Sequence, residues 1–276
     1  ATDVAHKAWW QIFEVVFGIP LLVAIVLQLA MPISIPVGAL APAQWLAAGV
    51  AQATRGHVEL AEAKGTLWKG EATLVLASGA GPASVRASLP ERLSWRLSPW
   101  QLLTGTLDLT LQHPSALSQP LVIRAWPSGR ATFGAATVRL PASLLVGLGA
   151  PWNTVRPGGV ITLSWDRLQI EPGRWQGNFS AEWQYASSAL TPVSPMGHYR
   201  LQTNGVFPGT QLDLLTLSGP LELTGSGTIA EGGRLRFQGV ARAVPNADPG
   251  VKTQLTGLIS LLGRRDGESA VLNIGS

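Results

Sequence analysis

The sequence predicts a mainly β protein, with one N-terminal transmembrane helix followed by a curved antiparallel β-sheet domain and two or three short helices. Three observations predict this class. A long apolar run lies near the start, and beyond residue 58 the apolar residues recur at every second position. Glycine (31) and proline (20) are plentiful, while charged residues make up only 13% of the chain. This composition is typical of a chain with many turns and few surface helices.

The apolar run predicts a membrane anchor over residues 8–31, behind a short cytoplasmic tip at 1–7. From Val15 to Met31 the only polar side chain is Gln28, and no residue is charged. A helix that crosses a bilayer needs roughly 20 mostly apolar residues. Trp9 and Trp10 lie where an interfacial aromatic belt is expected. We therefore expect a single-pass protein of the inner membrane, with the C-terminal bulk in the periplasm.

A cleaved signal peptide is the alternative for this segment. Signal peptides have a shorter apolar core, of roughly 7–15 residues, and a small-x-small cleavage site. The C-terminal end of the apolar core contains Gln28 and is followed by Pro32, which make a poor cleavage site. The small residues of Ala39–Ala41 fit a cleavage site but lie too far downstream. The uncleaved anchor is favoured.

Residues 32–57 are predicted to form an extended linker and a short helix. Pro32, Pro36 and Pro42 prevent the anchor helix from continuing. Pro42 then precedes the alanine-rich stretch 43–53, and proline is favourable in the first turn of a helix.

The remainder divides into a first β unit (58–140), a connecting helix or turn (141–159) and a second β unit (160–276). Alternation of apolar and polar residues predicts antiparallel strands with one buried face. It is clearest at 58–60, 72–76, 93–97, 107–111, 121–125, 161–165, 179–185, 199–205, 212–217, 221–229 and 235–243. A helix is expected over Lys252–Leu262 and a final strand over Ala270–Ile274.

Two short stretches of the β region read alike. Gly65–Ala72 and Gly173–Phe179 both contain a tryptophan, one further residue and a glycine, and both lead into an alternating strand. Either they mark two related β meanders, or a tryptophan-rich β chain repeats such stretches by chance.

The sequence lacks the residues and motifs that several classes of function require. The chain has no cysteine, and His6, His57, His113 and His198 are isolated in the sequence, without partners at metal-ligand spacing. No Gly-x-Ser-x-Gly or Walker motif occurs. The net charge of +4 comes from scattered arginines, unlike the clustered basic residues of nucleic-acid-binding proteins. We therefore expect no catalytic residue, no metal site, no cofactor, no enzymatic activity and no nucleic-acid partner.

Tryptophan is unusually frequent, with 11 residues. Trp95, Trp165 and Trp183 alternate with polar residues and are predicted to lie in the core. The tryptophans near turns are candidates for contact with a partner or the membrane surface: Trp45, Trp100, Trp126 and Trp152.

The chain resembles protein N of the bacterial type II secretion (general secretion) pathway. Gly65–Ala72, Leu140–Gly159, Gly232–Gly239 and Leu261–Gly267 carry the resemblance, in this order behind the anchor. It implies an accessory inner-membrane component with its bulk in the periplasm and no known catalytic residues. The β region is also similar to the curved, groove-forming sheets of AsmA-like lipid-transfer proteins.

Two functions follow. The first is a structural and interaction protein, whose β domain contacts other inner-membrane components of the secretion platform, for example through exposed strand edges. The alternative is a periplasmic lipid-binding or lipid-transfer protein. A sheet face that few helices cover must meet something apolar, and lipid acyl chains are apolar.

Overall fold

The computed structural model describes residues 41–79, 81, 84–230 and 234–275. The predicted tip (1–7) and anchor (8–31), together with the linker up to residue 40, lie outside the described residues. Among the helices described from residue 41 onward, none has the length and apolarity needed to span a bilayer.

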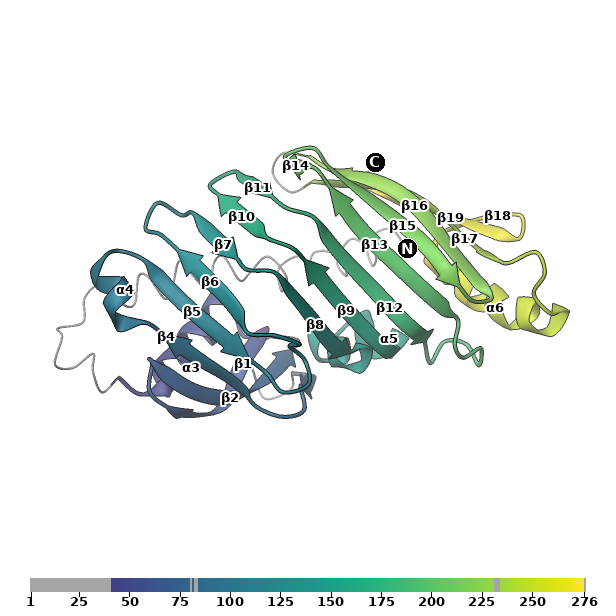
Figure 1. The fold of residues 1–276 in the computed structure, drawn as a ribbon. Coiled ribbons are helices and arrows are strands. Elements are labelled where there is room, and N and C mark those ends of the chain that lie inside the picture. The colour runs from purple at the N-terminus through teal and green to yellow at the C-terminus, as the bar shows by residue number, and fades with distance from the viewer. Residues whose placement is uncertain (1–40, 80, 82–83, 231–233, 276) are drawn as a thin grey trace.

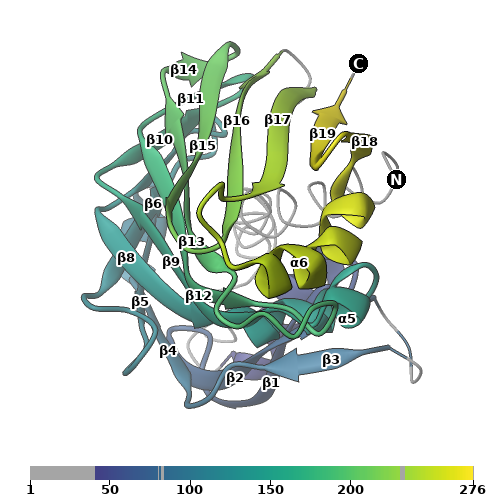
Figure 2. The same cartoon turned by 90° about the vertical axis from the view of Figure 1, so that its right-hand side faces the viewer.

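The described chain is mainly β, as predicted, and forms two antiparallel sheets that curve together into an open half-pipe (Figure 1, Figure 2). In spatial order the ten-stranded sheet contains β1 (Val58–Gly65), β2 (Lys69–Ala77), β4 (Leu93–Leu97), β5 (Leu107–Gln112), β6 (Leu121–Ala125), β7 (Ala131–Phe133), β10 (Leu168–Glu171), β11 (Arg174–Gln176) and β14 (Val206–Phe207), with β3 (Arg86–Ser88) paired to β2. The nine-stranded sheet contains β18 (Arg264–Asp266), β19 (Ser269–Ile274), β17 (Leu235–Ala243), β16 (Leu221–Ile229), β15 (Thr210–Ser218), β13 (Gly197–Asn204), β12 (Phe179–Ser187), β9 (Gly158–Trp165) and β8 (Ala136–Pro141).

The two sheets are joined because the chain repeatedly crosses from one to the other. It crosses between β7 and β8, β9 and β10, β11 and β12, β13 and β14, and β14 and β15. Gly177 makes one of these crossings, with φ +143°, and a Cβ there would lie 2.5 Å from the Arg167 carbonyl oxygen. A glycine lets the strand bend sharply at that point.

Sheet membership runs across the predicted division into 58–140 and 160–276. β8 precedes the connecting segment but joins the nine-stranded sheet, while β10, β11 and β14 follow it and join the ten-stranded sheet. Both tryptophan-glycine stretches lie at hairpins of the ten-stranded sheet. The division into two units stays a prediction.

Five helical elements accompany the sheets in the described part, more than the two or three predicted. They are α3 (Ala43–Ala53), α4 (Pro99–Leu103), η1 (Ala142–Leu148), α5 (Trp152–Val155) and α6 (Pro249–Leu262). The first, third and fifth match the predicted helices. The other two, α4 and α5, span only 5 and 4 residues, which is too short for a helical period to appear in the sequence.

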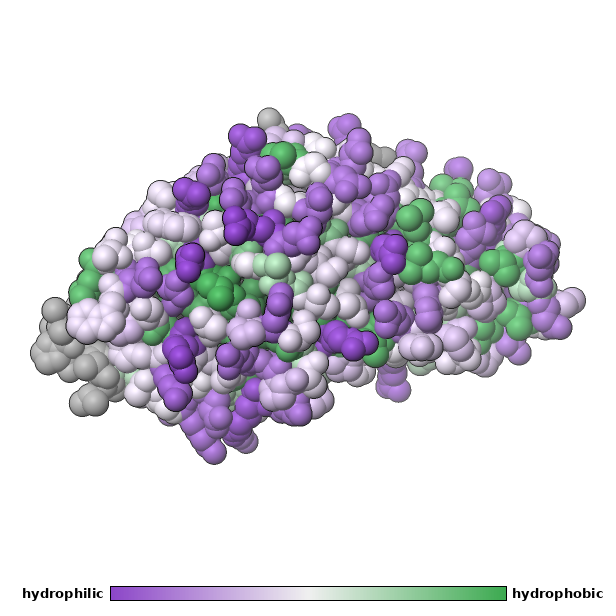
Figure 3. Space-filling model, in the orientation of Figure 1, coloured by the Kyte–Doolittle hydropathy of each residue, from purple (hydrophilic) through white to green (hydrophobic). Residues whose placement is uncertain are grey.

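The helices cover parts of the inner face of the half-pipe and leave the outer face to solvent. α3 packs Leu46 and Val50 onto the strands around Leu107 and Ile123. α6 packs Leu255 and Leu258 onto the other end, beside residues of β16, β17 and β19. The outer face is a mixture of polar and apolar residues (Figure 3).

Candidate functional site

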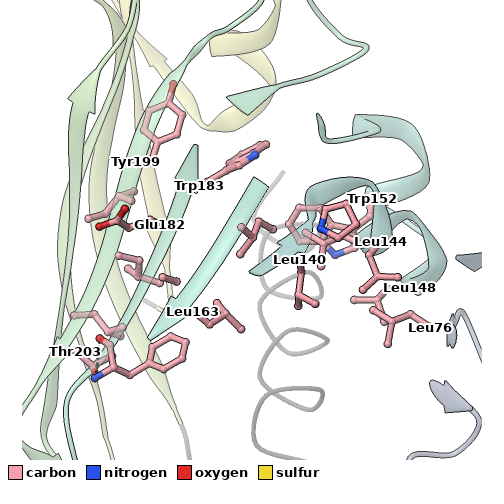
Figure 4. Close-up of a pocket in the computed structure, with 18 of the residues that line it drawn as sticks. Leu76, Leu140, Leu144, Leu148, Trp152, Leu163, Glu182, Trp183, Tyr199 and Thr203 are labelled. Atoms are coloured by element: carbon pink, nitrogen blue, oxygen red, sulfur yellow. Dashed lines mark hydrogen bonds between the residues drawn. The ribbon is translucent and has the colours of Figure 1, made fainter. Parts of the chain in front are cut away.

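Between the two helix-covered ends, the concave face of the sheet forms an apolar groove with a cavity of about 300 Å³. One wall is the sheet from β9 to β16, and the other is η1 and α5 together with Leu76 (Figure 4). The sheet wall is lined by Ile161, Leu163, Phe179, Ala181, Trp183, Tyr199, Leu201, Thr203, Leu212, Leu214 and Ile229, and Trp175 adjoins it from β11 of the other sheet.

Strand register explains why this wall is apolar. Neighbouring strands place Leu163 opposite Ala181, Ala181 opposite Leu201, and Leu201 opposite Leu214. Because side chains alternate between faces, residues that are paired in register share a face. The alternation predicted from the sequence therefore becomes a continuous apolar row across four strands.

The opposite wall comes from the segment predicted as a connecting helix or turn. Leu144, Leu148 and Trp152 line the groove from η1 and α5. Gly147 allows η1 to approach β2 closely, since a Cβ at this position would meet the Leu76 carbonyl oxygen. Leu76 and Leu163 thus line one cavity, although they are about 90 positions apart in the sequence.

Most polar atoms in the groove have partners within the protein. Trp183 Nε1 donates to the Gly158 carbonyl oxygen at 2.8 Å, and the Tyr199 hydroxyl donates to the Leu221 carbonyl oxygen at 3.0 Å. Glu182 lies between the groove-facing Ala181 and Trp183, so strand alternation directs its carboxylate to the outer face, where it accepts from Arg200 Nε at 2.8 Å. The hydrogen bond from Arg200 lowers the pKa of Glu182.

Trp152 differs from these residues, because its Nε1 is buried without a hydrogen-bond partner in the described structure. A buried N–H group that lacks an acceptor is costly, on the order of 1–3 kcal/mol. The groove therefore has a long apolar wall, and the indole N–H of Trp152 is buried behind the surface of the opposite wall.

The tryptophans that were predicted to lie in the core differ in burial, and His113 is buried with 4% of its surface exposed. Trp95 is buried, with 3% of its surface exposed, whereas Trp165 and Trp183 are half-buried. Trp100 is 76% exposed near its turn. In the described residues, no group of three or more His, Asp or Glu side chains is placed to hold a metal. His6 lies outside the described residues.

The sequence predicted a groove-forming sheet as one alternative, but it did not indicate which residues line the groove. Trp152 was predicted, with the other tryptophans near turns, as a candidate for contact with a partner or the membrane surface. A signal was present: in the segment 140–149 nearly every residue is apolar, although it joins two β regions and is too short to form a core of its own.

An open, curved antiparallel sheet with an apolar concave face defines a class of β proteins suited to binding along that face. The sequence identifies the family within this class, because the family model of type II secretion system protein N matches residues 56–272. The chain belongs to this family and is a component of type II secretion. No curated protein and no solved structure shows significant similarity to it.

Proposed function

We propose that the chain is a non-enzymatic accessory component of the type II secretion machinery, held at the inner membrane by residues 8–31 with its β domain in the periplasm. The family match over 56–272 carries this proposal. The apolar run Val15–Met31, which is long enough to cross a bilayer, supports the anchor.

The outer edge of β19 is the place where we expect a secretion partner to bind. β18 pairs with β19 only from Ser269 to Val271, whereas β17 pairs with it as far as Ile274. In the described structure, Leu272–Ile274 therefore have one edge without a strand neighbour. An exposed edge of this kind binds an extended segment through main-chain hydrogen bonds.

Deletion of the chain tests the accessory role, with export of a folded substrate as the readout. We expect substrate to accumulate in the periplasm and export to return when the chain is supplied again. Unchanged export after a clean deletion would contradict the proposal.

Site-specific photo-crosslinking tests the partner edge. A photo-reactive residue at Asn273, which is exposed on β19, should crosslink to another inner-membrane secretion component. As a control, the same photo-reactive residue is placed at Ser128, in the exposed turn between β6 and β7. It should not crosslink to a secretion component. Equal products from both positions would argue against a specific edge contact.

A second candidate function is binding of a lipid acyl chain in the groove. The observation that favours it is the apolar row Leu163–Ala181–Leu201–Leu214, which faces a cavity of about 300 Å³.

Two neighbouring residues provide a matched test of lipid binding. Leu214 lines the groove, whereas Leu215 points to the outer face and is 43% exposed. Leu214→Asp should remove lipid that co-purifies with the full chain, as detected by mass spectrometry, and Leu215→Asp should not. If the unchanged chain carries no lipid, or if both variants retain it equally, the groove is not a lipid site.

A further inference from the structure

The short helix α4 lies at one end of the half-pipe (Figure 1). It carries two large apolar side chains that are exposed. Trp100 is 76% exposed and Leu103 is 67% exposed, and no residue of this helix is buried. Residues three positions apart lie on one face of a helix, so the two side chains project together. Single exposed leucines are ordinary, but a tryptophan beside a leucine is the pairing found where proteins meet the membrane interface.

Two cations without acidic partners lie beside this helix. Lys69 of β2 and Arg96 of β4 are directly opposite in register, and both are exposed. Like charges at opposed positions repel each other. In the described part of the chain neither has an ion-pair partner, although the nearby Arg92 binds Glu62 and Glu71. Arg96 lies in the last part of β4, three residues before α4 begins at Pro99, so the positive charge is close to the apolar pair along the chain.

The chain also enters the described fold at this end. Leu67 N donates to the Ala41 carbonyl oxygen at 2.8 Å, and Pro42 bridges to Thr66 in the turn between β1 and β2. Leu97 N, at the end of β4 that leads into α4, donates to the Trp68 carbonyl oxygen at 2.7 Å. The entry point and α4 are therefore neighbours.

Chain length then limits how far this end can lie from the membrane. The predicted anchor ends at Met31, about ten residues before Ala41, and ten extended residues span at most about 35 Å. The end of the domain that carries the exposed Trp–Leu pair and the unpaired cations is thus the end that the anchor holds near the bilayer.

We propose that α4, Lys69 and Arg96 form a membrane-docking surface whose partner is an anionic phospholipid bilayer. Trp100 and Leu103 enter the interfacial layer, while Lys69 and Arg96 contact lipid phosphates. This proposal rests on the proposed membrane anchor and adds to it the face that the domain turns to the lipid.

The absence of cysteine allows a direct test on the full chain reconstituted in vesicles that contain phosphatidylglycerol. A nitroxide is attached to Leu103→Cys, and its collisions with oxygen, which concentrates in lipid, are compared with those with a water-soluble nickel chelate. The control is Leu261→Cys on α6, which is 63% exposed at the opposite end of the domain. We expect the ratio of oxygen to nickel accessibility to be several-fold higher at position 103 than at position 261.

The charge requirement is tested on the same labelled protein. Changing Lys69→Gln and Arg96→Gln together, or replacing phosphatidylglycerol by phosphatidylcholine, should lower the ratio at position 103 toward that of position 261. Circular dichroism spectra identical to those of the unchanged chain would confirm that the substitutions leave the fold intact.

Three outcomes would each contradict a different part of the proposal. If the chain remains with the vesicles after an alkaline wash but the label at 103 is as accessible to nickel as that at 261, docking is wrong and the anchor stands. If the label is shielded from both reagents, the surface binds protein instead of lipid. If the chain leaves the vesicles on washing, the proposed anchor itself fails.

Discussion

The hydroxyl of Tyr199 in β13 donates a 3.0 Å hydrogen bond to the carbonyl oxygen of Leu221, the first residue of β16. β15 separates these two strands in the order of the sheet, so this bond fastens the sheet across a strand at the rim of the groove. Tyr199→Phe removes the donor and leaves the ring. We expect the free energy of unfolding to fall by about 1 kcal/mol, measured by urea denaturation.

The same tyrosine predicts a response to alkaline pH. Burial raises the pKa of Tyr199 above the ordinary value, because the phenolate would lose its hydration. Its contribution to stability is therefore complete below about pH 10, the ordinary pKa, and is lost as the pH rises beyond it. Unfolding measured between about pH 9 and 11 should show a steeper loss for the unchanged chain than for Tyr199→Phe. Parallel curves would contradict this.

The ion pair between Glu182 and Arg200 predicts the opposite pH response. The two side chains are 26% and 39% exposed, and we expect a double-mutant cycle with Gln at both positions to give a coupling of about 0.2–1 kcal/mol. Because the hydrogen bond from Arg200 lowers the pKa of Glu182, the coupling is present above the ordinary Glu pKa of about 4.3 and is lost as the pH falls below it. A coupling that persists in acid would contradict the assignment.

Gly225 in β16 allows the Phe237 ring to lie against the strand. A Cβ at Gly225 would lie 2.5 Å from Phe237 Cζ and 2.6 Å from the Gln238 carbonyl oxygen. Gly225→Val should therefore lower the free energy of unfolding by roughly 1–3 kcal/mol. The control is Gly257 in α6, where a Cβ meets nothing within 4 Å, and Gly257→Ala should stabilise by up to about 1 kcal/mol. Equal effects at both positions would show that close packing is not the cause.

Asp248 caps α6 by accepting a 2.8 Å hydrogen bond from Gly250 N. Asp248→Ala should lower the free energy of unfolding by about 1 kcal/mol, and Asp248→Asn, which keeps an acceptor, should change it little. Thermal unfolding followed by circular dichroism measures both. A full loss in the Asn variant would indicate that charge, and not the cap bond, stabilises the helix.

Much of the β architecture could be predicted because alternation reports which residues share a face. Leu107, Leu109 and Leu111 alternate with polar residues, and they form β5 as expected. Alternation does not report which strand lies next to which. Nothing in Leu168–Glu171 indicates that it pairs with Ala131–Phe133 in the ten-stranded sheet, although β8 and β9 of the other sheet lie between them in the sequence.

The groove was only partly predictable for the same reason. The apolar faces of Leu201 and Leu214 were visible as alternation, but their opposite wall comes from η1 and α5, which approach in space after a long separation in sequence. Lys69 and Arg96 are 27 positions apart in the sequence, and only strand register makes them neighbours.

The crossing of strands between the two sheets has a consequence for how the protein folds. β7 pairs with β6 on one side and with β10 on the other, so a nascent chain that ends before Leu168 exposes an unpaired edge at Phe133. Neither half of the chain is complete without the other, and we expect a single cooperative unfolding transition. Fragments cut between Gly147 and Gly158 would present matching open edges at β7 and β10 and at β8 and β9, and strand pairing between them would restore both sheets from two separate polypeptides.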